Sequence, residues 1–197
     1  MKEFTVPMAL IDFIPVLLFL LACTRVEKDL AHRMTKISRT LFTSGYAIVF
    51  AAGTLKALYK LLYAIGAGDH SWMSAQFFSN QAFGFLLCGI GLTLAVTGKA
   101  KSRTYALLPV MSLVGIMIVG LGAMDASLCF LASKLRKRGA LICFIASFFL
   151  CLGMGYLSSR SFDKGSMNWI AEIVNIGGQG LLYAGVRMLH KAGLEKI

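Results

Sequence analysis

Four polar side chains recur along the last apolar block of the chain at steps of 4, 3 and 4 residues: Asn168, Glu172, Asn175 and Gln179. A helix would place them on one face, because such steps return to the same side about once per turn. A polar stripe on a membrane helix cannot face lipid, so it must face another helix or a wet cavity. It can therefore serve as a contact between helices or as a binding site. Glu172 favours a binding site, since a carboxyl group inside a bilayer is costly and usually marks a ligand site or a pathway.

Charged residues inside two other apolar blocks extend this candidate site. Lys56 and Lys60 lie in the second block, and Asp12 lies in the first, just before Pro15. Lys60 is near the end of its block, so we expect its side chain to extend to the membrane interface. Lys56 lies deeper and needs an acidic partner, for which Asp12 is the first candidate and Asp125 the second. The pattern predicts an ion pair between Lys56 and Asp12, and a kink at Pro15.

The third apolar block contributes an amide side chain. Gln76, Asn80 and Gly84 recur at every fourth position, which places Asn80 on one helix face with them. The segment DHSWMSAQFFSNQAFGFLL can be aligned with DKGSMNWIAEIVNIGGQGLL, and this alignment pairs Asn80 with Asn175. Apolar helices share residues easily by chance, and we favour that explanation. The alternative is a true repeat, which would give two three-helix units as in many transporter folds.

These patterns together predict a substrate-binding site formed by six residues: Asp12, Lys56, Asn80, Glu172, Asn175 and Gln179. Acidic and basic groups at such a site can coordinate a zwitterion or relay protons. The 5 cysteines and 3 histidines form no metal-binding pattern, so we expect no metal and no cofactor. No catalytic residue is assigned.

The composition indicates where such a site must lie. Hydrophobic residues make up 57% of the chain, charged residues only 15%, and the mean hydropathy is +0.73. Soluble domains carry about 25% charged residues. The apolar residues come in blocks long enough to cross a hydrocarbon core of about 30 Å as helices. The net charge of +11 comes from short clusters between these blocks, where basic side chains meet lipid head groups rather than nucleic acid.

The chain is therefore expected to be all-α, a polytopic membrane helix bundle that forms a single integral membrane domain over residues 1–197. We predict six transmembrane helices, at about residues 5–24, 40–64, 75–97, 105–134, 139–158 and 168–190. The fourth block is about 45 Å long as one helix, which exceeds an upright crossing. It can form one tilted helix, continue along the interface beyond about Ala123, or re-enter the membrane.

The fourth block also decides the orientation. With six simple crossings, the basic loop after the first helix and the KLRKR loop lie on opposite faces, and the positive-inside rule gives little preference. If the fourth block enters and leaves on one side, the four basic regions share one face. We take six crossings as the first hypothesis, although the charge distribution favours the second.

Three functions are consistent with these features. The first is binding or transport of a small polar or charged solute. The second is a sensor or a membrane subunit of a larger complex. The third is an intramembrane enzyme for a lipid-like substrate, with Glu172, Asp12 or Asp125 as acid–base groups. We favour the first and a location in the cell (inner) membrane. Membrane lipids are the expected partners, and a second copy of the chain or another protein stays open as a partner.

Overall fold

Helices account for all regular secondary structure in the computed structural model, which describes residues 4–98, 113–158 and 165–197. The elements, in chain order, are α1 (Val6–Ile11), α2 (Phe13–Leu30), α3 (Lys36–Ala64), α4 (Ser71–Ala75), α5 (Phe77–Thr97), α6 (Leu113–Lys134), α7 (Arg138–Ser158), α8 (Gly165–Lys191) and the 3-10 helix η2 (Leu194–Lys196). The prediction of an all-α helix bundle is confirmed. The predicted start of the fourth span near residue 105 lies outside the described residues.

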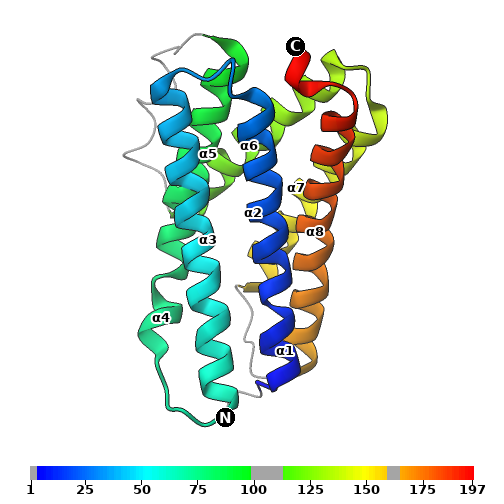
Figure 1. The fold of residues 1–197 in the computed structure, drawn as a ribbon. Coiled ribbons are helices and arrows are strands. Elements are labelled where there is room, and N and C mark those ends of the chain that lie inside the picture. The colour runs from blue at the N-terminus through cyan, green and yellow to red at the C-terminus, as the bar shows by residue number, and fades with distance from the viewer. Residues whose placement is uncertain (1–3, 99–112, 159–164) are drawn as a thin grey trace.

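The six long helices pack in a closed ring. Each contacts the next one in chain order, and α8 closes the ring by packing on α2 (Figure 1). The centre is filled by apolar side chains from all six helices, including Phe19, Phe42, Phe85, Leu128 and Phe144. Burial of these side chains is the main source of packing between helices whose outer faces are also apolar.

Helix directions do not alternate around this ring. Thr93 Oγ1 on α5 lies 3.2 Å from Ser127 Oγ on α6, and one turn earlier Gly89 lies against Gly120. Residue numbers rise together along the two helices, so α5 and α6 are parallel. By contrast, Ser38 Oγ on α3 donates to the Gly91 carbonyl on α5, at 2.7 Å, where the first helix begins and the second ends. These two helices are antiparallel.

The directions divide the chain into two units with the same path. The first unit (α1–α5) and the second unit (α6–η2) each run up, down and up, with the third helix packed on the second (Figure 1). In each unit a serine of the second helix donates to a glycine carbonyl of the third: Ser38 to Gly91 at 2.7 Å and Ser147 to Gly178 at 2.9 Å. The two units thus share a path, although the alignment that pairs Asn80 with Asn175 does not pair Gly91 with Gly178.

One end of the bundle collects the basic residues. The α2–α3 loop, the α6–α7 turn and the end of α8 all lie at this end, at the top of Figure 1. Every described Lys and Arg other than Lys56 and Lys60 lies in these loops or in the adjoining helix ends. The fourth basic region, residues 99–103, lies outside the described residues. Parallel α5 and α6 thus agree with the hypothesis in which basic regions share a face, and not with six alternating crossings.

Four helical segments are long and apolar enough to cross a membrane: Val6–Leu30, Lys36–Ala64, Ser71–Thr97 and Leu113–Lys134. The described apolar part of α7, Arg138–Met154, is shorter. Helix α8 has sufficient length, but its polar stripe lowers its hydropathy. The predicted helix bundle thus contains six long helices, of which four meet the requirements for a membrane span within the described residues.

The first span is broken at Asp12. Helix α1 ends at Ile11 and α2 starts at Phe13. Pro15 explains this break, because it has no N–H to donate to the Ile11 carbonyl and its ring crowds that carbonyl. The interruption places Asp12 at the junction of two helical segments that together form one membrane-length span, Val6–Leu30. The kink at Pro15 stays a prediction.

Close packing of α5 and α6 depends on glycine. A Cβ atom added to Gly120 would collide with the backbone of Leu86. A Cβ atom added to Gly153 of α7 would meet no described atom within 4 Å. We therefore expect Gly120→Ala to lower the free energy of unfolding by about 1–3 kcal/mol through overpacking. Gly153→Ala, the matched control, should raise it by about 0.5–1 kcal/mol because alanine favours the helix. Thermal unfolding in detergent measures both, and equal effects would contradict the parallel contact.

Candidate functional site

Lys60 is the centre of a buried cluster of charges. Its Nζ atom lies 2.8 Å from Asp12 Oδ2 and 2.5 Å from Glu172 Oε1. The three residues are 6%, 5% and 4% exposed. Because charges at such depth require partners, the two carboxylates and the ammonium hold one another in the bundle.

Three different helical segments position this cluster. Lys60 lies one turn before α3 ends, Asp12 at the break between α1 and α2, and Glu172 in the second turn of α8. The cluster therefore lies toward the end of the bundle opposite the basic end. It also joins the two units, since Asp12 and Lys60 belong to the first unit and Glu172 to the second.

Aromatic rings cover the cluster on its outer side. The Phe4 ring centroid lies 5.9 Å from Lys60 Nζ. Phe4 also makes edge contacts with Tyr59 and Tyr63, with ring centroids 6.1 and 5.6 Å apart. These rings limit access of water to Lys60, which strengthens its interactions with the two carboxylates.

Two small cavities adjoin the cluster, with volumes of about 40 and about 80 Å³. Both are lined by Lys56, Gln81, Asn175 and Gln179, and Asp12 also lines the smaller one. Amide and ammonium groups from α3, α5 and α8 therefore converge on one space. A polar cavity of this size has room for a few water molecules, since one molecule needs about 10–15 Å³.

One buried acceptor on the wall of this space, Gln179 Oε1, has no hydrogen-bond donor in the described part of the chain. The Gln179 amide nitrogen donates to Cys151 Sγ at 3.7 Å, which turns the amide without satisfying its oxygen. An unsatisfied buried acceptor is costly, so this oxygen is well placed to accept from a bound molecule that carries donors.

Lys56 has a different environment from the one predicted. Its Nζ atom lies 4.0 Å above the centre of the Phe77 ring, and among the described residues no carboxylate lies within ion-pair distance of it. The predicted pair with Asp12 is wrong, and so is the expectation that Lys60 extends to the interface. Both errors have one cause. The two lysines lie one turn apart on the same helix face, and Lys60, the one nearer the helix end, is enclosed by α1 and the first turns of α8.

The stripe on α8 faces the bundle as predicted. Asn168, Glu172 and Gln179 are buried, and Asn175 lines both cavities. Asn80 is only half-buried and does not line either cavity. Its neighbour Gln81 lines both, and sequence analysis missed it because the spacing of Gln76, Asn80 and Gly84 pointed to the adjacent helix face.

Asp125, the second candidate partner for Lys56, lies elsewhere in the core. It is 4% exposed, and neither carboxylate oxygen has a hydrogen-bond partner among the described residues. It lies close enough to Cys151 and Cys129 to interact with them electrostatically. The structure thus brings Asp12 and Glu172 together but leaves Asp125 out of that cluster.

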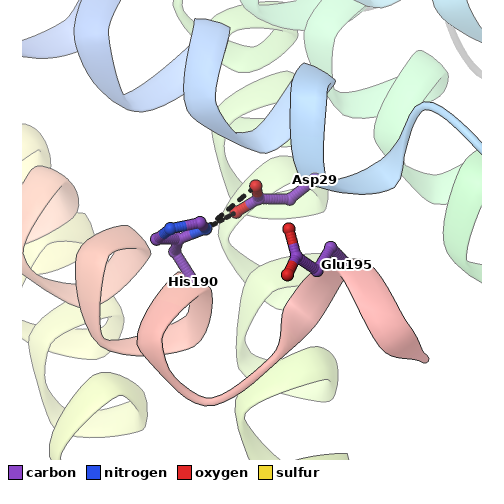
Figure 2. A group of neighbouring side chains, drawn as sticks. All are labelled: Asp29, His190 and Glu195. Carbon is purple, nitrogen blue, oxygen red and sulfur yellow. Dashed lines mark hydrogen bonds and ion pairs between the residues drawn. The ribbon is translucent and has the colours of Figure 1, made fainter.

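A second charged group lies at the basic end. Figure 2 shows His190 pointing toward Asp29, with Glu195 beside them, and His190 Nδ1 lies 3.0 Å from both Asp29 oxygens. In the described residues these are the side chains whose ligand atoms lie close enough, within 4.8 Å, to hold a metal ion. The bond between His190 and the buried Asp29 accounts for the arrangement without an ion.

Comparison with known proteins leaves the site to be interpreted from its geometry. No protein-family model matches the chain. No curated protein has a significantly similar sequence, and no solved structure is significantly similar. The fold and site define an all-helical bundle with membrane-length apolar helices and a buried cluster of ion pairs.

The cluster predicts that Lys60 and not Lys56 is coupled to Asp12. Lys60→Met should lower the free energy of unfolding by about 3–5 kcal/mol, because it leaves two buried carboxylates without their cation. Lys56→Met removes the same charge from the same helix, but it should cost only about 0.5–2 kcal/mol through loss of the contact with Phe77.

Double-mutant cycles with Asp12→Leu test this assignment by thermal unfolding in detergent. The cycle with Lys60→Met should show clear coupling, whereas the cycle with Lys56→Met should be additive. Coupling of Asp12 to Lys56 alone would contradict the structure.

Proposed function

We propose that the chain is an integral membrane protein that binds or transports a small polar or charged solute at the interface between its two three-helix units. The observation that carries this proposal is Lys60, which joins carboxylates of both units beside cavities lined by amides. Ionisable residues inside membrane bundles usually mark pathways or ligand sites. In transporters built from repeats, the solute site lies where the repeats meet.

The charges at the site indicate the chemical class of the solute. Asp12, Glu172, Lys56 and Lys60 sum to zero when all are ionised. A cationic group with hydrogen-bond donors can compete with Lys60 for Glu172 Oε1 and satisfy the Gln179 Oε1 atom on the cavity wall. An anionic group on the same solute can bind Lys56, which lies without a carboxylate partner in the described residues. A small zwitterion meets both requirements. The smallest cation that this site could bind is a proton shared between Asp12 and Glu172.

Cavity size sets a further condition. The two cavities are smaller than the about 300–1,000 Å³ typical of ligand pockets. In this conformation the site admits water or a small ion, and a larger solute requires the units to separate. Separation would take Lys60 away from Glu172, because that ion pair crosses the unit boundary. Lys60 would stay with Asp12, which belongs to the same unit. Breaking one of the two ion pairs is thus the proposed opening step.

The small volume also favours a second candidate, a membrane subunit or sensor in which the cluster only joins helices. Glu172→Gln distinguishes the two functions, because the amide keeps the shape of the side chain and removes its charge. For a solute site, glycine as a zwitterionic probe should raise the unfolding temperature of the parent protein, and Glu172→Gln should abolish that shift. Acetate should give no shift in either protein.

The exposed Asp69, which lies in the α3–α4 loop, provides the matched control for this experiment. Asp69→Asn removes one carboxylate outside the cluster and should retain the glycine response. If the parent protein shows no shift with glycine or ammonium while Glu172→Gln is strongly destabilised, the cluster is structural and the subunit function is favoured.

The charge distribution also predicts the orientation in the membrane. Basic loops stay on the cytoplasmic side, so the end that holds the α2–α3 loop and the α6–α7 turn should be cytoplasmic. In a variant with the native cysteines replaced, a cysteine introduced by Arg33→Cys should be protected from an impermeant thiol reagent in intact cells. Asp69→Cys, at the opposite end, should be labelled. The reverse result would contradict this orientation.

A further inference from the structure

A third cavity lies far from the ion-pair cluster. It is a cleft of about 620 Å³ between α2 and α8, at the basic end of the bundle. Its volume falls within the range typical of ligand pockets. Four cationic side chains line it: Arg25, Lys28, Arg187 and Lys191. We refer to it as the basic cleft.

Among the described residues, the cations of the basic cleft outnumber the acids beside it. Asp29 has an oxygen 3.9 Å from Arg25 Nε, and Glu195 lies beside Asp29 and His190 (Figure 2). Asp29 is 4% exposed and accepts from His190 Nδ1 through both oxygens, so its charge is already engaged. The side chain of Arg25 is 42% exposed and free to turn into the cleft. Two arginines and two lysines from two helices form a site suited to an anion with several oxygens, such as a phosphate.

Hydrogen-bonding groups complete this site. His190 also lines the cleft, and its Nδ1 atom is held by Asp29, so Nε2 points away from that carboxylate (Figure 2). The Asp29 contact fixes the orientation of the ring, as second-sphere carboxylates do for other histidines. Thr24 and Tyr183 line the same space, and the Thr24 hydroxyl donates to the Leu20 carbonyl of its own helix at 2.9 Å.

The outer face of α1 and α2 indicates what carries the phosphate. Leu10, Ile14, Leu17 and Leu21 are 54%, 43%, 51% and 50% exposed and follow one another at helical spacing. Leu21 lines the deep side of the basic cleft, while Lys28 lines it about 10 Å closer to the end of the bundle. One continuous face thus changes from apolar to basic at the cleft. This gradient matches a phospholipid, whose acyl chain can lie along the leucines while its head group enters the cleft.

We propose that the basic cleft binds the phosphate head group of an anionic phospholipid. The site lies at the end of the bundle that carries the basic loops, and cytoplasmic leaflets are rich in anionic lipids. Basic pockets between membrane helices on that side are suited to such head groups. The lipid bridges α2 of the first unit and α8 of the second.

Binding of dioctanoyl phosphatidylglycerol to the purified full chain in detergent tests the proposal, with dioctanoyl phosphatidylcholine, a zwitterion without net charge, as the comparison. The parent protein should prefer phosphatidylglycerol. Arg25→Gln combined with Arg187→Gln should weaken its binding about tenfold or more, because two charge-assisted hydrogen bonds to phosphate are lost. Arg33→Gln combined with Arg138→Gln, which removes two arginines at the same end outside the cleft, should leave binding within about twofold.

A second variant and two soluble phosphates distinguish the lipid site from its alternatives. Lys28→Gln with Lys191→Gln changes two exposed cleft residues and should weaken binding even if the arginine variant fails to fold. Inorganic phosphate and glycerol 3-phosphate should bind much more weakly than the lipid, since they lack acyl chains. Equal binding of glycerol 3-phosphate would replace the lipid by a soluble phosphate. Equal loss in the Arg33/Arg138 variant, or no preference over phosphatidylcholine, would overturn the site.

Discussion

A buried ammonium group needs anionic partners, and the arrangement of this bundle depends on how Lys60 obtains them. Its Nζ atom contacts Asp12 from the helix break and Glu172 from α8. In a medium of low dielectric constant, each of these contacts is much stronger than in water, and each group left alone would be costly. The ion pairs therefore fix where α8 lies relative to α3 and to the break in the first span. Glu27, the other buried acid of α2 near α3, obtains its partners within the first unit: Arg39 at 2.8 Å and Tyr46 at 2.6 Å.

The two units share a path but not a distribution of charge. Each runs up, down and up, and their interfaces recur in the same order around the ring. The ion-pair cluster interrupts this similarity, since it takes a lysine and an aspartate from the first unit and a glutamate from the second. In a ring of two similar units, the last long helix of each unit meets the first long helix of the other. The two interfaces are α5 with α6 and α8 with α2. The first is closed by glycine contacts, and the second carries polar groups along its length. The proposed solute site thus lies at the interface that glycine packing does not close.

Much of this could be predicted from sequence, because it depends on periodicity and on the cost of polar groups in lipid. The stripe on α8 and the burial of Asp12 follow from those two rules. The identity of the paired lysine did not follow, since Lys56 and Lys60 share a helix face and only the position of neighbouring helix ends distinguishes them. Gln81 was missed for a similar reason, because it lies one position from the face that spacing suggested. The direction of α6 was also open, because hydropathy identifies helices without giving their direction, although the basic loops favoured the arrangement observed.

Helices α2 and α8 carry both candidate sites, and this has a mechanical consequence. At one end they present Asp12 and Glu172 to Lys60, and at the other they present Arg25 and Arg187 to the basic cleft. The helices are parallel and continuous between these residues, so a rotation that separates Asp12 from Glu172 must also change the spacing of the two arginines. A ligand that bridges α2 and α8 in the cleft binds one spacing better than another, and it therefore stabilises one state of the ion pairs. By linkage, occupation of the polar site would change the affinity of the cleft by the same factor. Helices that move as rigid bodies would couple the two proposed sites directly, without a chain of intervening contacts.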